Sequence, residues 1–288
     1  MREVYARVTQ IARKHLYQFM KDNQISPLTY HFDYYFDTCV EVYDIKILEH
    51  HFSNRKIEGL TMIDDEGISF SYEKENPIVK QNFTKCHELG HFILAHDGNM
   101  FTELSSGSES RLETEANFFS AVILMPDIVL LSNIYYRKSR FSKILSDLVV
   151  SSEALIYRLR DMFRFYLDSD YQDINQAISD YRLNNNKLIL ELFGQIKDEI
   201  EAEYKAVGVN PLVAIFSALE TNNFVSSNDF PDLLENDFRK NLEQIDSNIG
   251  TWTLFDFGKK IGYAWDKEKM TKQQAQSRAK TILLLETR

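Results

Sequence analysis

Residues 82–94 read N-F-T-K-C-H-E-L-G-H-F-I-L, and this stretch decides the fold. Residues 83–95 are predicted to form a helix that apolar flanking residues keep buried. Residues four apart lie on the same face of a helix, about one turn from each other. The pattern H-E-x-x-H therefore predicts that His87 and His91 bind one metal ion together, with zinc as the expected cofactor.

Glu88 follows the first histidine and is expected to act on a water molecule rather than on the metal. A zinc ion lowers the pKa of a bound water to about 7. Glu88 can then take the proton of this water and pass it to a leaving amine. The five residues 87–91 thus predict a peptide-bond hydrolase with Glu88 as its catalytic acid and base.

A third ligand is expected on a second helix, predicted from about Ser110 to Met125, because catalytic zinc has three protein ligands and one open position. Glu113 shares a helical face with small residues, which would let the two helices approach closely. Glu115 shares a face with bulky residues. Glu113 is therefore preferred as the third ligand, and Glu115 remains the alternative. His96 would lie about 140° around a continuing helix from His91, as an outer or surface residue.

The two cysteines, Cys39 and Cys86, predict no disulfide framework. Cys86 precedes His87 and invites a role as a metal ligand. Its side chain would point about 100° around the helix from that of His87. We therefore interpret Cys86 as a small packed residue.

The composition is that of an ordinary globular protein, with 44% hydrophobic and 26% charged residues among 288. The formal net charge of −10 argues against binding nucleic acid by bulk charge, though not against a local basic patch. The first residues lack the apolar core of a signal peptide, and we see no apolar run of about 18 residues. A cytoplasmic protein without a membrane span is expected.

Hydrophobic periodicity predicts a mostly helical α+β fold. A helix is expected over residues 2–22. Residues 57–63 and 68–72 are expected to form a hairpin in a short sheet that packs on the motif helix. Three further segments are predicted as a polar loop (98–107), as short helices with a break at Val150–Ser152 (139–165), and as helices interrupted at 208–211, 222–231 and 248–250 (169–288).

Two runs resemble the ImmA/IrrE metallopeptidases. These are residues 82–94 and the run E-T-E-A-N-F-F-S-A-V-I-L-M-P from Glu113 to Pro126. The family pattern is a helix with H-E-L-G-H, then E-x-x-A-N-x-F-A, then L-M-P. The resemblance covers roughly residues 35–165. It implies a zincin-like core of gluzincin type, with zinc on His87, His91 and Glu113 and with Glu88 as the catalytic residue. Cys86 and Ser120 stand where alanine is usual, which leaves this chemistry unchanged.

The same resemblance implies a cytoplasmic endopeptidase that cleaves a helix-turn-helix repressor encoded nearby and so derepresses phage, mobile-element or stress genes. The alternative is a DNA- or protein-binding regulator, including a toxin–antitoxin component, with a structural or degenerate zinc site. Residues 145–159 are similar to a helix-turn-helix-like segment of the family. We interpret them as a packing module, so direct nucleic-acid binding is not expected. The oligomeric state is left open.

Three domains are expected on these grounds. Residues 1–126 would form the zincin-like metallopeptidase domain, and residues 127–168 the helix-turn-helix-like segment. Residues 169–288 match nothing that we can name and are expected to form an all-α domain. We expect this last part to recognise the substrate or to inhibit the enzyme.

Overall fold

The computed structural model describes residues 2–52, 57–96, 98, 100–104, 110–167, 171–256 and 258–285. The chain divides into two compact units, Met1–Val207 and Gly208–Arg288. The division coincides with the interruption predicted at 208–211. The predicted boundaries after residues 126 and 168 lie inside the first unit and remain predictions about domain organisation.

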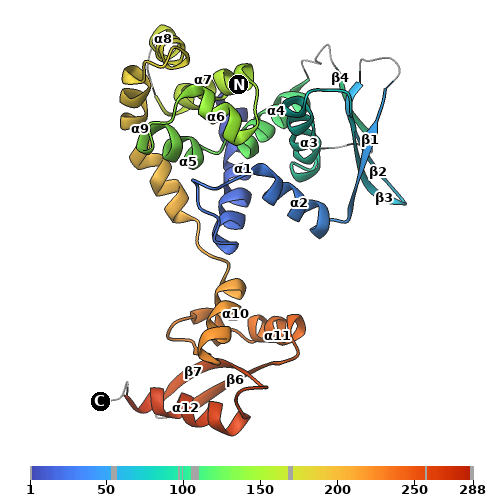
Figure 1. Cartoon of the computed structure of the whole chain (residues 1–288). Coiled ribbons are helices and arrows are strands. Elements are labelled where there is room, and N and C mark those ends of the chain that lie inside the picture. Colours follow the sequence, from blue (N-terminus) through green and yellow to red (C-terminus); the bar gives the residue numbers. More distant parts are fainter. Residues whose placement is uncertain are drawn as a thin grey trace. The chain divides into compact units, whose positions relative to one another are not determined.

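The first unit combines a sheet with many helices, which confirms the mostly helical α+β class (Figure 1). Its strands are β1 (Ile45–His50), β2 (Ile57–Asp64), β3 (Gly67–Glu73) and β4 (Met100–Leu104). Its helices are α1 (Arg2–Asp22), α2 (Phe32–Val42), α3 (Ile78–Ile93), α4 (Arg111–Leu124), α5 (Asp127–Leu130), the π-helical η1 (Leu131–Tyr136), α6 (Phe141–Leu148), α7 (Ser152–Tyr166), α8 (Tyr171–Arg182) and α9 (Lys187–Ala206).

The sheet has the strand order β1-β3-β2-β4, with β1 parallel to β3 and the other pairs antiparallel. The predicted hairpin is confirmed, because β2 and β3 pair from Gly59↔Tyr72 to Asp64↔Gly67. Gly67 closes the turn with φ of 116°, a value that favours glycine over residues with a Cβ.

One prediction is wrong at strand β4, which lies at the edge of the sheet. Residues 98–107 were expected to form a polar loop, but Met100–Leu104 pair with β2, and Phe101 lies opposite Thr61. A strand of five residues is too short to show a clear alternating pattern in the sequence. Its pairing with β2 is what makes it a strand.

Helix α3 packs on one face of the sheet and lies beside α4 (Figure 1). A side chain at Gly90 would meet the Cα of Ala116 at 3.3 Å and the ring of Phe119 at 3.2 Å. Both distances are shorter than most Cβ contacts, so a larger residue at this position would push the two helices apart by a few tenths of an ångström.

The turn before α7 was predicted correctly. Helix α6 ends at Leu148, and Val149 takes the left-handed conformation with φ of 49°. Ser151 then caps α7, because its side chain accepts a hydrogen bond from the backbone N–H of Ala154 at 3.0 Å.

The second unit is not all-α, and that prediction is wrong. It contains the sheet β5-β7-β6, with α10 and α11 on one face and α12 on the other (Figure 1). Its elements are α10 (Pro211–Asn222), β5 (Phe224–Ser226), the 3-10 helix η2 (Pro231–Leu234), α11 (Asn236–Ile245), β6 (Ile249–Asp256), β7 (Lys259–Asp266) and α12 (Lys272–Leu285). In β7, Ile261, Tyr263 and Trp265 pack towards α12 while Ala264 faces the opposite core. This is the two-residue period of a strand and not the helical period predicted from the sequence.

One helical segment of the first unit is unusually apolar. Residues 111–136 form a helical segment long and apolar enough, by length and composition, to cross a membrane. Of its most apolar window, 78% is buried inside the protein, as in the core helix of a globular unit. This stretch comprises α4, α5 and η1.

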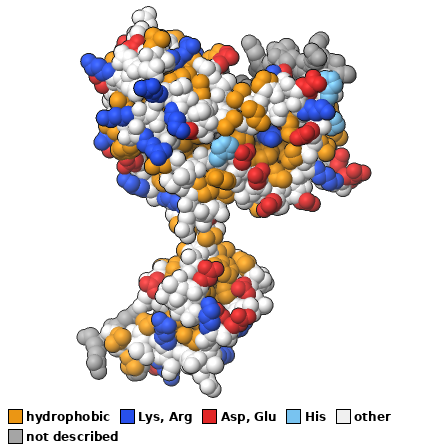
Figure 2. Space-filling model, viewed as in Figure 1, with side chains coloured by type: hydrophobic (Ala, Val, Ile, Leu, Met, Phe, Trp, Pro, Cys, Tyr) orange, Lys and Arg blue, Asp and Glu red, His pale blue; other side chains and the backbone are white. Residues whose placement is uncertain are grey.

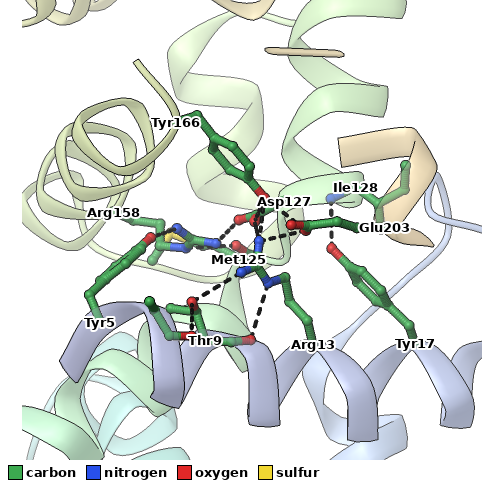
Figure 3. Close-up of polar contacts among 11 residues, drawn as sticks. Tyr5, Thr9, Arg13, Tyr17, Met125, Asp127, Ile128, Arg158, Tyr166 and Glu203 are labelled. Atoms are coloured by element: carbon green, nitrogen blue, oxygen red, sulfur yellow. Dashed lines mark hydrogen bonds and ion pairs between the residues drawn. The ribbon is translucent and has the colours of Figure 1, made fainter. Parts of the chain in front are cut away.

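A buried ionic cluster joins four helices of the first unit (Figure 3). Asp127, at the start of α5, accepts hydrogen bonds from Arg158 of α7 and, at 3.0 Å, from Arg13 of α1. Arg13 also bonds Glu203 of α9 at 2.6 Å. Burial raises the pKa of Asp127, but the charges of the two arginines outweigh this effect and hold it below its usual range.

Arg158 lies in the helix-turn-helix-like segment, and its side chain is fully buried. Besides Asp127 it donates to the backbone carbonyl of Met125 at 3.0 Å and to the hydroxyl of Tyr5 at 2.8 Å. The guanidinium thus fastens α7 to α1 and to the end of α4. These contacts agree with the interpretation of this segment as a packing module.

We predict that Asp127→Asn lowers the free energy of unfolding of the first unit by about 3–5 kcal/mol, because the substitution leaves buried arginine charge unpaired. Urea denaturation followed by far-UV circular dichroism measures this loss. The two tryptophans, Trp252 and Trp265, lie in the second unit, so the transition seen by their fluorescence serves as an internal reference.

Asp147→Asn is the matched control. Asp147 pairs with Lys143 at 2.5 Å on the surface, where an ion pair contributes less than about 1 kcal/mol. Equal losses in the two variants would contradict a structural role for the buried cluster.

Candidate metal centre

Helix α3 carries both histidines on one buried face. His87 and His91 are each 1% exposed. Their Nε2 atoms lie 3.1 Å apart, one turn of helix from each other. The helix keeps them in place because Leu89 and Cys86 on its other sides are buried in the core.

Glu113, from the first turn of α4, brings one carboxylate oxygen close to each imidazole. Its Oε2 lies 3.2 Å from His87 Nε2, and its Oε1 lies 3.4 Å from His91 Nε2. Ligands about 2.0–2.1 Å from a tetrahedral ion are separated by about 3.3 Å. One donor atom from each of the three residues lies within 4.8 Å of the others, so the three side chains are close enough to share a single zinc ion. The structure thus brings together His87, His91 and Glu113, and their role as metal ligands stays a prediction.

Glu115 points elsewhere. Its carboxylate pairs with Arg7 of α1, with Arg111 at 2.8 Å and with His96 at 3.2 Å. Burial raises the pKa of Glu115, but its bonds to Arg7, Arg111 and His96 outweigh this effect and lower it to about 2. Three donors therefore engage the side chain that was the alternative third ligand.

Asn117 has a role that sequence reasoning missed. His87 Nδ1 lies 3.0 Å from Asn117 Oδ1. If Nδ1–H donates to this oxygen, the lone pair of His87 Nε2 is free to bind a metal ion. Asn117 follows Glu113 by one helical turn, which is the signal in the sequence that could have suggested a partner for His87.

Glu88 is buried under strand β2. Thr61 donates a hydrogen bond to its Oε2 at 2.5 Å, while its Oε1 has no hydrogen-bond partner among the described residues. Burial raises the pKa of Glu88 to about 8. A cation at the three donor atoms would oppose this shift, because a nearby opposite charge favours the carboxylate.

Gly59 provides the space for this carboxylate. A Cβ at residue 59 would overlap Glu88 Oε1 and would come within 2.5 Å of Thr84 Cγ2. The strand can lie over the helix at this point only because residue 59 has no side chain.

Strand β4 adds two side chains that sequence reasoning also missed. Phe101 stacks on the ring of His91 with centroids 4.7 Å apart. Glu103 is paired in register with Gly59, and its Oε2 is buried without a hydrogen-bond partner among the described residues. The sequence pattern predicts a loop for residues 98–107, so it connects neither Phe101 nor Glu103 with the histidines.

The charge balance at this place favours a cation. Burial lowers the pKa of His87, but the hydrogen bond to Glu113 and the charges of Glu103, Glu88 and Glu113 raise it to about 9. A divalent ion would balance the negative charge of the same carboxylates, so that the imidazole of His87 would not need to be protonated. The donor set and the two unpartnered oxygens, of Glu88 and Glu103, therefore fit a bound zinc ion.

Comparison with known proteins identifies the region that contains this site. Residues 40–160 match the peptidase M78 family model, described as the IrrE N-terminal-like domain. The match runs from the end of α2 to the middle of α7 and includes all the donor residues. No curated protein and no solved structure matches the chain.

We predict that Gly59→Ala lowers the free energy of unfolding of the first unit by about 1–3 kcal/mol, because the added methyl group overpacks a filled site. The loss is measured by urea denaturation followed by circular dichroism. Zinc content is expected to stay at the wild-type level, since Glu88 is not one of the donor atoms.

Gly194→Ala, in helix α9, is the control for this substitution. Its Cβ would meet the ring of Tyr135 at an ordinary 3.7 Å, and alanine in a helix is favoured over glycine by about 0.5–1 kcal/mol. A Gly59→Ala protein as stable as wild type would show that residue 59 does not constrain the position of Glu88.

Proposed function

We propose that this chain, whose residues 40–160 form an IrrE N-terminal-like domain of the peptidase M78 family, is a zinc-dependent endopeptidase. The observation that carries the proposal is that His87, His91 and Glu113 each bring one donor atom within 4.8 Å of the others. Oε1 of Glu88, the residue after His87, supports it because this oxygen has no hydrogen-bond partner among the described residues. His87, His91 and Glu113 are the proposed ligands.

Zinc, when bound, supplies a Lewis acid that lowers the pKa of a water to about 7 and polarises the scissile carbonyl. The chain supplies the proton carrier. Thr61 holds Oε2 of Glu88, which leaves Oε1 to accept a proton from the attacking water and to deliver it to the leaving nitrogen. Asn117 fixes the ring of His87 during this cycle.

The proposed substrate is a helix-turn-helix repressor encoded near this protein. A peptidase-family domain supports a protein substrate, and the resemblance to the ImmA/IrrE peptidases suggests the narrower class. We assign recognition of that substrate, or restraint of the enzyme, to residues 169–288. The proposed compartment is the cytoplasm.

One observation favours the alternative of a nucleic-acid-binding regulator. On the face drawn in Figure 2, lysine and arginine side chains gather over the part of the first unit that contains α8 and α9. Two observations argue against this alternative. The chain as a whole is acidic, and Arg158 of the helix-turn-helix-like segment is buried and cannot reach a nucleic acid. Cleavage and DNA binding can be separated in one experiment.

We predict that wild-type protein cuts the co-encoded repressor, that a chelator stops the reaction, and that Glu88→Gln lowers its rate by about 10²–10⁴-fold because the proton carrier is lost. Electrophoresis of the repressor and mass spectrometry of its fragments measure cleavage. Glu88→Gln is expected to retain one zinc ion per chain in elemental analysis.

Glu113→Gln is expected to lose zinc, whereas Glu115→Gln, measured with zinc in excess, is expected to keep it. The reverse pattern would overturn the assignment of the third ligand. A wild-type protein that leaves the repressor intact and instead shifts its operator DNA would replace the peptidase with the regulator.

A further inference from the structure

The end of helix α3 turns the chain back on itself. Ala95 takes the left-handed conformation with φ of 51°. Its N–H bonds the carbonyl of Phe92 at 3.0 Å, and the N–H of His96 bonds the carbonyl of His91 at 3.1 Å. These two bonds form a Schellman motif, which brings the residue after the turn beside the last turn of the helix. A continuing helix would have carried His96 away from His91.

The two imidazoles meet directly as a result. His91 Nδ1 lies 2.8 Å from His96 Nδ1, and His96 Nε2 lies 3.2 Å from Glu115 Oε2. The side chains of His96 and Glu115 are each 4% exposed. His91, His96 and Glu115 thus form a continuous buried chain of polar contacts that starts behind the proposed zinc ligand.

Only one arrangement of protons suits this chain when His91 binds a metal ion. Nε2 of His91 must offer its lone pair, so the proton of the neutral ring lies on Nδ1 and is donated to Nδ1 of His96. The neutral ring of His96 then carries its proton on Nε2 and donates it to Glu115. Each bond has one donor and one acceptor, so the contacts fix the orientation of the His91 ring as well as its tautomer.

Glu115 is in turn held by helix α1, which lies outside the matched domain. Arg7 of α1 pairs with its Oε2, and Arg111 donates to its Oε1 at 2.8 Å. The side chains of Arg7 and Arg111 are 45% and 70% exposed, so either can be replaced without creating a cavity in the core.

We propose that His96 and Glu115 are positioning residues of the metal centre, which hold His91 with Nε2 towards the ion, and that Arg7 makes the N-terminal helix part of this support. The inference rests on the proposed zinc site. Outer partners of metal-bound histidines typically change metal affinity by about 10–100-fold. Asn117 contacts His87 directly and orients its ring. Glu115, in contrast, acts on His91 through the imidazole of His96.

Zinc affinity, measured by competition with a chromophoric chelator, tests the proposal without any substrate. We expect His96→Ala to raise the zinc dissociation constant by about 10–100-fold. His96→Gln, which retains one acceptor and one donor, should recover part of this loss. Arg7→Met should raise the constant by a smaller factor, and Lys14→Met, an exposed cation on the same helix, should leave it unchanged.

Two measurements separate support of His91 from general damage to the fold. Thermal unfolding of the metal-free proteins shows whether His96→Ala has simply destabilised the unit. Ala95→Gly suits the left-handed position and keeps the turn, so its zinc affinity should equal that of wild type. Long-range ¹⁵N–¹H spectra of the zinc form should show the proton of His91 on Nδ1.

The outcomes distinguish this inference from the proposed function. If wild type binds zinc and His96→Ala binds it equally well, the positioning role is overturned while the zinc site stands. If wild type binds no zinc, both are overturned. If the expected affinities are found but no repressor is cut, the positioning role holds and the proposed peptidase activity fails.

Discussion

The contact between α3 and α4 at Gly90 and Ala116 is the constraint on which the proposed centre depends. The first helix carries the histidines and the second carries Glu113, and the donor atoms can converge only if the two backbones nearly touch. A glycine on one side and an alanine on the other provide that distance. Ser120, further along α4, adds a hydrogen bond to the carbonyl of Phe83 at 3.0 Å that fixes the crossing.

Around this crossing, residues from separate parts of the chain make polar contacts with the two histidines and with the residues that surround them. Asn117 supports His87 from within α4. His96, in the turn after α3, contacts His91, and Glu115 of α4 contacts His96. Arg7 of α1 pairs with Glu115. Helix α1 is itself fastened through Arg13 to the buried cluster at Asp127. Residues 40–160 are therefore in polar contact with a helix that precedes them.

Much of the centre could be predicted because its signals are local. The spacing of His87 and His91 follows from one helical turn, and the preference for Glu113 over Glu115 follows from small side chains on one face of α4. The hairpin around Gly67 and the cap at Ser151 are also set by neighbours in the sequence. Phe101 and Glu103 could not be found in this way, because a strand of five residues exists only through its pairing with β2.

The sequence alone determined the motif helix, the donor types and the chemistry that they favour, since a helix imposes its own period on its residues. Tertiary structure decided that Glu115 faces Arg7 and His96. It also decided that His96 meets His91, that β4 closes the sheet, and that the second unit contains strands. The physical reason is the same in each case. Local periodicity follows from backbone hydrogen bonds between near neighbours, whereas these contacts join segments that only the packed core brings together.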